Sequence, residues 1–350
     1  MRVRYSECPA NHSELFFSVV IANYNYGRFL RQAVESALTQ DWPHVEVIVV
    51  DDGSTDNSAE VIDSFGEAIT AIFKENGGQR EANNMGFAKS SGDVVIFLDA
   101  DDVLVPGALR SIASVWRTGL TKVQVLMERV DAHGRPIHND NAIPKIRNVI
   151  PKVPPGLSPE AIRQWAYRTS EYPTPPGSGN AWARSFLRKI FPLDASCDSF
   201  TDSTCIAMAP YMGDVETIPA PLVLYRMHGE NDSAMSANTN NFGREIARAL
   251  KRHHAACKAC AMTGRPPPPI STLFCAPHLL QLRVASLRLT PEKHPLPGDS
   301  RLRALRDALS IPFRPNFERA AFRCLIAGWS IVTLLAPMNI ARSLIRRRFV

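Results

Sequence analysis

The sequence predicts an α/β fold: a doubly wound, mainly parallel sheet with helices on both faces, followed by a helical C-terminal extension. Apolar, β-branched runs alternate with amphipathic runs through about the first 120 residues. Apolar runs without polar alternation are typical of strands buried on both faces, as in parallel sheets. The short connections between the runs fit repeated βαβ units.

The first part of the chain contains four expected strands and four expected helices. The strands are the apolar runs at 16–22, 45–50, 68–73 and 94–98. The helices, with apolar residues at helical spacing or capping residues at their starts, are 29–40, 54–65, 79–90 and 105–116. Each expected strand is thus followed by an expected helix, as a doubly wound sheet requires.

The chain is expected to divide into a tail (1–14), a first half (15–120), a second half (121–235) and a helical extension (236–350). The second half is less regular because it holds two proline-rich loops. Its expected elements are helices at 181–191 and 204–212 and a strand at 215–229. In the basic extension, "GRPPPP" indicates a linker or turn.

The C-terminal segment 324–350 combines an apolar run with arginines. Residues 324–341 carry no charge, and Arg342 and Arg346–Arg348 follow. This run is at the lower limit for a bilayer span of about 20 residues, and Pro337 interrupts it. The segment can span a membrane, lie in its interface with arginines on anionic lipid, or form a buried helix. Contact with a membrane surface is favoured.

Composition restricts the function classes. The net charge of +6 permits anionic partners, but the terminal arginines lack interleaved aromatics, which disfavours nucleic acid. The seven cysteines are scattered and no apolar run precedes Leu15, so a cytoplasmic protein is expected. Cys257 and Cys260 form a CxxC without a second pair, which favours an ordinary helix over a zinc site. P-loop and dinucleotide fingerprints are absent.

Three polar clusters follow expected strands: "NYNYGR" (23–28), "DDGSTDNS" (51–58) and "DADD" (99–102). The carboxyl ends of parallel strands share one edge of a sheet, so the clusters are expected to meet there. The second cluster can equally turn the chain and cap a helix. Three crowded carboxylates in the third raise one another's pKa, and a divalent ion with phosphate oxygens relieves that repulsion.

Other protein classes share parts of this pattern. The D-x-D-x-V after the fourth strand also resembles the nucleophile loop of haloacid-dehalogenase-like phosphatases, which normally follows the first core strand. The pair Asp51–Asp52 resembles the acidic pocket of receiver domains, but the order and length of the elements differ.

Taken together, the motifs resemble family 2 glycosyltransferases, which are inverting nucleotide-sugar transferases with the GT-A fold. The stretch 16–116, from "FSVVIANYNYGRFL" to "FLDADDVLVPGAL", resembles the nucleotide-sugar half of that family. "GSGNAWARSFLRKIFP" and "FTDSTCIAMAPYMGDVETIPAPLVLYRMHGEND" resemble its acceptor half. On this resemblance 15–120 binds the donor and 121–235 the acceptor.

The resemblance implies a set of donor-binding residues. "NNMG" stands where many relatives have "RNxG", so Asn83 takes the place of the arginine and Arg80 is a possible substitute. The implied donor-binding residues are Asn23, Tyr24, Asn25, Asp51, Asp52, Gly77, Gly78, Arg80, Asn84, Asp99 and Ala100.

The resemblance also implies a metal site with Mn²⁺ or Mg²⁺, held by Asp99, Asp101 and His228. Asp101 is the expected direct ligand, and Asp99 lies nearer the ribose and a metal-bound water. The ion neutralises charge on the leaving nucleotide. Asp102 is expected to cap the next helix.

Inverting transfer needs a base that takes the proton of the acceptor hydroxyl. The resemblance places it at Asp202, with Asp198 as the alternative; Thr201 replaces the glutamate of the usual Glu-Asp pair. The loop Gly177, Ser178, Gly179 and Asn180 is expected beside the donor sugar or acceptor, or to be an ordinary helix N-terminus.

The expected function is a metal-dependent inverting hexosyltransferase that uses a nucleotide-diphosphate sugar, by default a UDP-sugar. The expected acceptor is a hydroxyl of a glycan or a lipid-linked glycan in cell-surface polysaccharide synthesis, at the inner face of the membrane. The alternative is a catalytically silent nucleotide-sugar-binding module, motivated by "NNMG" and the missing glutamate.

Overall fold

The computed structural model describes residues 14–139, 146–154, 156–229, 242–314 and 319–349. Within these, the chain forms two compact units. The first contains residues up to 162 together with 173–228, and the second contains 163–172 together with the chain from 229 onward. Residues 1–13 of the expected tail and 236–241 of the expected extension lie outside the described residues.

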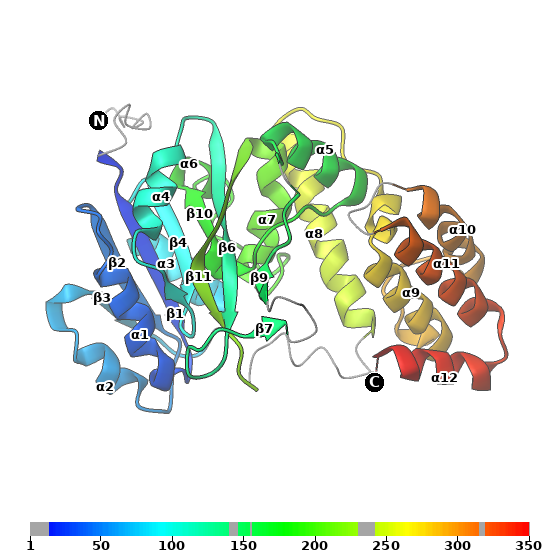
Figure 1. Cartoon of the computed structure of the whole chain (residues 1–350), viewed down its shortest axis with the longest axis horizontal. Helices are drawn as coiled ribbons and strands as arrows, with labels where there is room; N and C mark the ends of the chain where they lie inside the picture. The colour runs from blue at the N-terminus through cyan, green and yellow to red at the C-terminus, as the bar shows by residue number, and fades with distance from the viewer. Residues whose placement is uncertain (1–13, 140–145, 155, 230–241, 315–318, 350) are drawn as a thin grey trace. The chain divides into compact units, whose positions relative to one another are not determined.

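The first unit is built on one mixed sheet (Figure 1). Its strand order is β3 (Thr70–Phe73), β2 (Val45–Asp51), β1 (Phe17–Asn23), β4 (Val94–Asp99), β10 (Asn180–Ala183), β6 (Leu120–Val130), β11 (Asp214–Arg226), β5 (Val103–Leu104). A short strand, β9 (Val149–Ile150), also pairs with β6, and β7 (His138–Asn139) pairs with β8 (Ile146–Arg147). Strands β3, β2, β1 and β4 run parallel, as do β6 and β11, which confirms the mainly parallel sheet.

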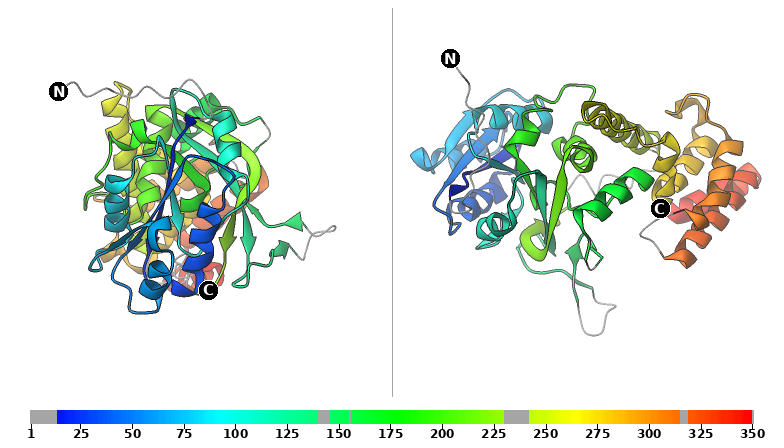
Figure 2. Two further views of the ribbon diagram at one scale, coloured as in Figure 1. Left: turned by 90° about the vertical axis from the view of Figure 1, so that its left-hand side faces the viewer. Right: turned by 90° about the horizontal axis from the view of Figure 1, so that it is seen from above.

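Helices cover both faces of this sheet (Figures 1 and 2). They are α1 (Gly27–Leu38), α2 (Ser58–Asp63), α3 (Gln79–Lys89), α4 (Ala108–Val115), α6 (Arg184–Leu187) and α7 (Thr201–Met212). Helices α1 and α3 both pack on β1 and β2. Val19, Val20 and Ile21 of β1 are fully buried although successive side chains point to opposite faces. The apolar runs of the first half therefore become central strands, as expected.

The second half of this unit differs from expectation in two places. Residues 120–130 form the long central strand β6, which the sequence did not indicate. The helix expected at 181–191 is instead strand β10 followed by the single turn α6. Trp182 is fully buried, and β10 pairs antiparallel with both β4 and β6. A short apolar run is ambiguous between helix and strand, and here the two flanking strands decide. Helix α7 and strand β11 form where they were expected.

The second unit is helical. It contains most of α5 (Pro159–Thr169) and α8 (Phe242–Met262), α9 (Pro277–Leu289), α10 (Arg301–Ser310), α11 (Ala320–Leu335) and α12 (Met338–Phe349). Leu280 and Val284 of α9 are buried with Ala304 and Ala308 of α10 and Leu334 of α11. Figure 2 shows α9 to α12, coloured yellow to red, gathered into one bundle. The expected linker at "GRPPPP" lies between α8 and the 3₁₀ turn Ile270–Cys275.

The structure can be compared with the expectations for the uncharged C-terminal run and for the CxxC pair. The uncharged run 324–341 is divided between α11 and α12, which break at Ala336 and Pro337. Among the described residues, every helix is too short or too polar to cross a membrane. Cys257 and Cys260 lie on α8, and Cys257 Sγ contacts His253 Nε2 at 3.6 Å.

Candidate functional site

The strand registers place the three polar clusters at one edge of the sheet. Asn23, the last residue of β1, pairs in register with Asp51, the last residue of β2. On the other side of β1, Ala22 pairs with Asp99 at the end of β4. Phe73 ends β3 beside Asp51 and is 51% exposed. The carboxyl ends of four parallel strands thus meet, which is where open α/β sheets bind ligands.

The first cluster forms an internally bonded loop. Asp51 Oδ1 accepts hydrogen bonds from Asn23 Nδ2 (2.7 Å) and Ser54 Oγ (2.6 Å). The backbone N–H of Asn25 donates to Ser54 Oγ at 2.9 Å, and Asn25 adopts φ 58°, which asparagine tolerates. Asp51 is buried and shapes this loop, while Tyr24 remains 46% exposed.

Asp52 organises the glycine pair. Its Oδ1 accepts from Lys74 Nζ (2.5 Å) and from the N–H of Gly77 (2.9 Å), and its Oδ2 accepts from the N–H of Gly78 (2.7 Å). Gly78 has φ +87°, a conformation that L side chains rarely adopt. The buried carboxylate therefore holds the loop that leads into α3.

The "NNMG" residues on α3 connect this helix to the second half of the chain, residues 121–235. The side-chain amide of Asn84 donates to the carbonyl of Leu193 and accepts from its N–H, both at 2.9 Å. Asn83 is buried and donates from Nδ2 to Thr201 Oγ1 at 3.0 Å. Both amides thus have structural partners within the protein. The remaining expected donor-binding residues are Arg80, half-buried, and Ala100, buried.

The "DADD" cluster brings two of the three expected metal ligands, Asp101 and His228, into contact. Asp101 Oδ2 lies 2.9 Å from His228 Nε2, although 127 residues separate them. The ring of His228 packs against Phe29 with centroids 5.0 Å apart, and its side chain is 4% exposed. Asp99 Oδ1 accepts a hydrogen bond from Gln79 Nε2 at 3.0 Å.

These donor atoms fit a hard divalent cation whose remaining ligands come from a bound diphosphate. Among the described residues, no three His, Cys, Asp or Glu side chains are grouped as a complete metal site. Asp101 and His228 together offer one carboxylate and one imidazole, donors that suit Mn²⁺, and carboxylates also suit Mg²⁺. Mg²⁺ in proteins is commonly held by one or two carboxylates plus substrate phosphates.

Asp102 does not cap a helix, contrary to expectation. It is fully buried: its Oδ2 accepts from Ser178 Oγ (2.6 Å) and its Oδ1 from the N–H of Arg226 (3.0 Å). The N-cap of α4 makes no side-chain hydrogen bond. Burial, and then the charges of Asp101 and Asp99, raise the pKa of Asp102 well above its usual value. The sequence could not show this because both partners are distant in the chain.

The loop that begins at Gly177 contacts both the carboxylate cluster and helix α7. The N–H of Gly177 donates to Asp202 Oδ2 at 3.0 Å, and a Cβ on Gly177 would lie 2.8 Å from Asp99 Oδ2. Ser178 Oγ accepts from the N–H of Asp99 (3.0 Å) while donating to Asp102. The loop is a 3₁₀ turn rather than the N-terminus of an α-helix.

The end of this loop is anchored on a buried lysine. Asn180 Oδ1 accepts a hydrogen bond from Lys122 Nζ at 2.6 Å. Lys122 is fully buried; burial lowers its pKa well below the usual value, and the charges of Asp202 and Cys205 oppose that shift. Gly179 is buried, and a Cβ there would lie 2.5 Å from the Pro175 ring. These contacts set the position of the loop against β6.

The two expected bases differ in their surroundings. Asp198 is 2% exposed, and its carboxylate accepts hydrogen bonds from the Ser199 N–H (2.8 Å) and Ser203 Oγ (2.7 Å). Asp202 lies in the first turn of α7, is partly exposed, and shares the Gly177 contact with the carboxylate cluster. Asp202 is therefore the residue of the two that lies beside the D-x-D edge.

Sequence reasoning missed two residues that build this site. Arg226 donates from Nε to the carbonyl of Asp101 (2.8 Å) and from Nη2 to Gln32 Oε1 (2.5 Å), and its N–H contacts Asp102. Its position two residues before His228, in the same motif, was the available signal. Lys122 gave none, because the strand that carries it was not expected.

The sequence of this chain is similar to those of known proteins. A family profile described as "Glycosyl transferase family 2" matches residues 18–187. An uncharacterized glycosyltransferase of a Nostoc species is 36% identical over 232 residues, covering 64% of this chain and 68% of that protein. Glycosyltransferase GlyG of Streptococcus pneumoniae is 38% identical over 104 residues, which are 29% of this chain and 34% of GlyG.

Solved structures agree on the fold. TarS 1–349 of S. aureus, solved in complex with UDP-GlcNAc, has a TM-score of 0.52 at 15% identity, covering 94% of this chain and 92% of that chain. The same protein solved with UDP has a TM-score of 0.51. These likenesses, the ordered motifs and the sheet that gathers them confirm the GT-A fold, and the chain belongs to glycosyltransferase family 2.

Proposed function

We propose that this glycosyltransferase is a metal-dependent, inverting hexosyltransferase that acts on a nucleotide-diphosphate sugar. One observation carries the proposal: the Gly177–Ser178 loop contacts both the carboxylate cluster and the candidate base. The Gly177 N–H donates to Asp202, and Ser178 bonds Asp99 and Asp102. A donor held at the D-x-D edge would therefore lie next to Asp202.

The nucleoside would bind over the ends of β1 and β2. Asp51 and Asp52 are buried and hold the two loops, so their backbone and the exposed ring of Tyr24 face a ligand more readily than their carboxylates do. Phe73 adds a second exposed ring at this edge and can stack on a base. UDP-sugars are the first donors to test, because TarS was solved with UDP-GlcNAc.

The diphosphate would bind beside the Asp101–His228 pair. These two residues would hold a divalent ion, with Asp99 oriented by Gln79 on its donor side. The ion, when bound, neutralises charge that develops on the leaving nucleotide. Arg226 holds the backbone of Asp101 and Asp102, so it fixes where these carboxylates point.

Transfer would be a single displacement at the anomeric carbon. Asp202 takes the proton of the acceptor hydroxyl as its oxygen forms the new glycosidic bond and the bond to the diphosphate breaks. Attack on the face opposite the leaving group inverts the configuration. The Gly177 N–H holds one oxygen of Asp202 at 3.0 Å and so fixes the orientation of its carboxylate.

We infer that the acceptor is a glycan or lipid-linked glycan hydroxyl in cell-surface polysaccharide synthesis, and that the enzyme works at the cytoplasmic face of a membrane. The support is the helical unit, where Arg342, Arg346 and Arg347 are exposed on α12 and Leu325 and Leu335 are exposed on α11. Arginines beside exposed apolar side chains favour an anionic lipid surface.

The test is a panel of UDP, GDP, dTDP and CMP sugars, incubated with Mn²⁺, Mg²⁺ or EDTA and assayed for donor turnover. We expect turnover of one donor, abolished by EDTA and restored by Mn²⁺. The variant Asp101→Asn should lose turnover and the metal-dependent rise in melting temperature while keeping its fold.

An exposed carboxylate far from the sheet edge gives the matched control. Asp41→Asn makes the same chemical change at a side chain that is 50% exposed and pairs with Arg110. It should retain full turnover. Full turnover by Asp101→Asn, or turnover unaffected by EDTA, would contradict the metal-dependent mechanism. Nucleotide-sugar binding without turnover in any condition would instead support the silent binding module.

A further inference from the structure

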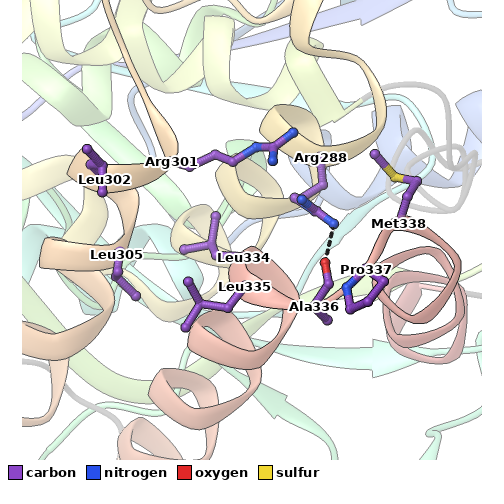
Figure 3. Close-up of a pocket in the computed structure, with 9 residues that line it drawn as sticks. All are labelled: Arg288, Arg301, Leu302, Leu305, Leu334, Leu335, Ala336, Pro337 and Met338. Atoms are coloured by element: carbon purple, nitrogen blue, oxygen red, sulfur yellow. Dashed lines mark hydrogen bonds between the residues drawn. The ribbon is translucent and has the colours of Figure 1, made fainter.

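The helical unit contains a pocket with an unusual charge content. It has a volume of about 600 Å³ and lies between α9, α10, α11 and the α11–α12 turn (Figure 3). Four leucines line it, at 302, 305, 334 and 335, together with two arginines, Arg288 and Arg301. Among the described residues, no aspartate or glutamate lines it. We refer to it as the arginine pocket.

Arg288 is buried and has no acidic partner in the part of the chain that the structure describes. Its side chain comes from α9, the residue is 5% exposed, and its Nη2 donates to the carbonyl of Ala336 at 2.6 Å. Its Nε has no hydrogen-bond partner among the described residues. An unpaired buried donor on a charged group is costly unless a ligand satisfies it. Burial, and then the charge of Arg301, lower the pKa of Arg288.

Arg301 brings a second positive charge to the same pocket. Figure 3 shows the two guanidinium groups near one another, with the leucine side chains beside them. Two cations that repel each other at an apolar pocket mark a place where an anion lowers the free energy. Arginine guanidinium groups bind phosphate with paired N–H donors, so a phosphate group fits best.

The surface around the pocket is apolar. Leu302 is 78% exposed, Leu335 68%, and Met338 40%, and all three line the pocket. Farther along the same helices, Leu325 of α11 and Ile340 of α12 are 67% and 47% exposed. Exposed apolar side chains gathered around a pocket indicate contact with a membrane or another protein.

The positive charge near the pocket distinguishes a membrane from a second copy of this chain as the occupant. The exposed side of α12 adds Arg342, Arg346 and Arg347 next to the apolar residues. A second copy of this chain would bring the same arginines and repel them, whereas an anionic bilayer offers phosphates for the arginines and acyl chains for the leucines. The arrangement matches a lipid surface in both respects.

We propose that the arginine pocket binds the phosphate head group of an anionic membrane phospholipid, with the leucines at its rim resting on the acyl chains. This inference deepens the membrane association proposed above by naming its site and lipid class. It predicts recognition of lipid phosphate by Arg288 and Arg301, beyond general attraction to a charged surface.

The test is sedimentation of the full chain with vesicles, without any nucleotide sugar, so that failure of glycosyl transfer cannot affect it. The vesicles are phosphatidylcholine alone, phosphatidylcholine with about a third phosphatidylglycerol, and phosphatidylcholine with a small fraction of polyprenyl phosphate. We expect binding to the phosphatidylglycerol vesicles, and Arg301→Glu should weaken it by about tenfold or more.

A matched charge reversal on the same helix supplies the control. Arg303 is exposed two residues along α10, about 200° around the helix axis from Arg301, and does not line the pocket. Arg303→Glu should weaken binding by less than about threefold. Arg288→Met should also weaken binding, with circular dichroism reporting the fold; if it fails to fold, the pair Arg301→Glu and Arg303→Glu decides.

Four outcomes would overturn the proposal. The first is an equal loss of vesicle binding for Arg301→Glu and Arg303→Glu, and the second is binding to neutral vesicles that does not depend on lipid charge. The third is binding only to vesicles that contain polyprenyl phosphate. The fourth is a chain that does not bind vesicles but forms a dimer, with the dimer lost in Leu335→Gln. The third outcome would make the pocket an acceptor site, and the fourth would make it an interface between copies.

Discussion

The two units differ in how their buried charges are arranged. At the edge of the sheet, three carboxylates lie within the four residues 99–102, and burial together with the charges of Asp101 and Asp99 raises the pKa of Asp102. In the helical unit, Arg283 bonds both Asp299 and Asp307 at 2.6 Å, while Arg288 on the same helix has no acidic partner among the residues that the structure describes. Buried charges with an opposite partner stabilise the folded state, whereas several charges of one sign crowded together indicate a binding site for a ligand of opposite charge.

The most direct test of the site at the sheet edge is substitution of its candidate base, Asp202. Asp202→Asn should lower kcat by about 10²- to 10⁴-fold with little change in melting temperature, because it removes the proton acceptor and keeps the shape. Rates of glycosyl transfer at saturating donor measure this.

Asp198→Asn is the matched control, since it changes the same group four residues earlier. It should lower the melting temperature, because Ser199 and Ser203 lose a charged acceptor, but keep kcat within a few-fold. A larger kcat loss for Asp198→Asn than for Asp202→Asn would reverse the assignment of the base.

The paired charges of the helical unit should matter for stability. Asp307→Ala should lower the free energy of unfolding by about 3 kcal/mol, because it leaves Arg283 and Arg314 short of a partner in a buried site. Urea unfolding of the full chain measures the change.

Two controls separate this effect from ordinary loss of charge. Asp41→Ala breaks an exposed pair and should cost about 0.5 kcal/mol or less. Arg288→Met should cost less than Asp307→Ala, because within the described ranges Arg288 has no carboxylate partner that the substitution would leave unpaired. Equal costs for the three variants would remove the distinction between paired and unpaired charges.

The loop at the sheet edge should be sensitive to a single methyl group. Gly177→Ala places a Cβ 2.8 Å from Asp99 Oδ2, so the loop or the carboxylate must move. Misplacement by about 1 Å can cost up to about 10²-fold in rate, so kcat/KM should fall by about 10- to 100-fold. Gly328→Ala, where a Cβ meets nothing within 4 Å, should leave kcat/KM unchanged.

The smallest expected effect is a pH dependence of the helical unit. Burial of Asp299 raises its pKa, but hydrogen bonds from His294 and Arg283 lower it more, so the folded pKa lies below the unfolded value of about 3.9. This stability is complete above the unfolded pKa and is lost as pH falls toward the folded pKa.

About 1 kcal/mol should therefore disappear between pH 6 and pH 3 from this group. Urea midpoints at both pH values, compared with those of Asp299→Asn, measure it. A variant with the same pH slope as the parent chain would show that Asp299 does not contribute.

Much of the first half could be predicted because its signals are local. Apolar runs of the parallel strands are complete in themselves, and β1, β2, β3 and β4 lie within two residues of their expected bounds. The pairing of Asp101 with His228 could be expected only through the family resemblance, since 127 residues separate them.

The failures also have physical reasons. Strand β6 was missed because Lys122, Gln124 and Glu128 interrupt its apolar pattern. In the fold all three are buried, Lys122 against Asn180 and Gln124 against the carbonyl of Pro173. Lys122 Nζ and Gln124 Nε2 donate hydrogen bonds to partners that only the folded chain brings near.

The α/β alternation, the polar clusters at the strand ends and the basic, apolar C-terminus could be read from the sequence alone, because each depends on residues close together in the chain. The hydrogen bonds of Asp102 to Ser178 and Arg226, the position of Gly177 between Asp202 and Asp99, and the lack of an acidic partner for Arg288 among the described residues became visible only in the folded chain. Hydrogen bonds and charge balance depend on distance in space, which strand pairing and helix packing set.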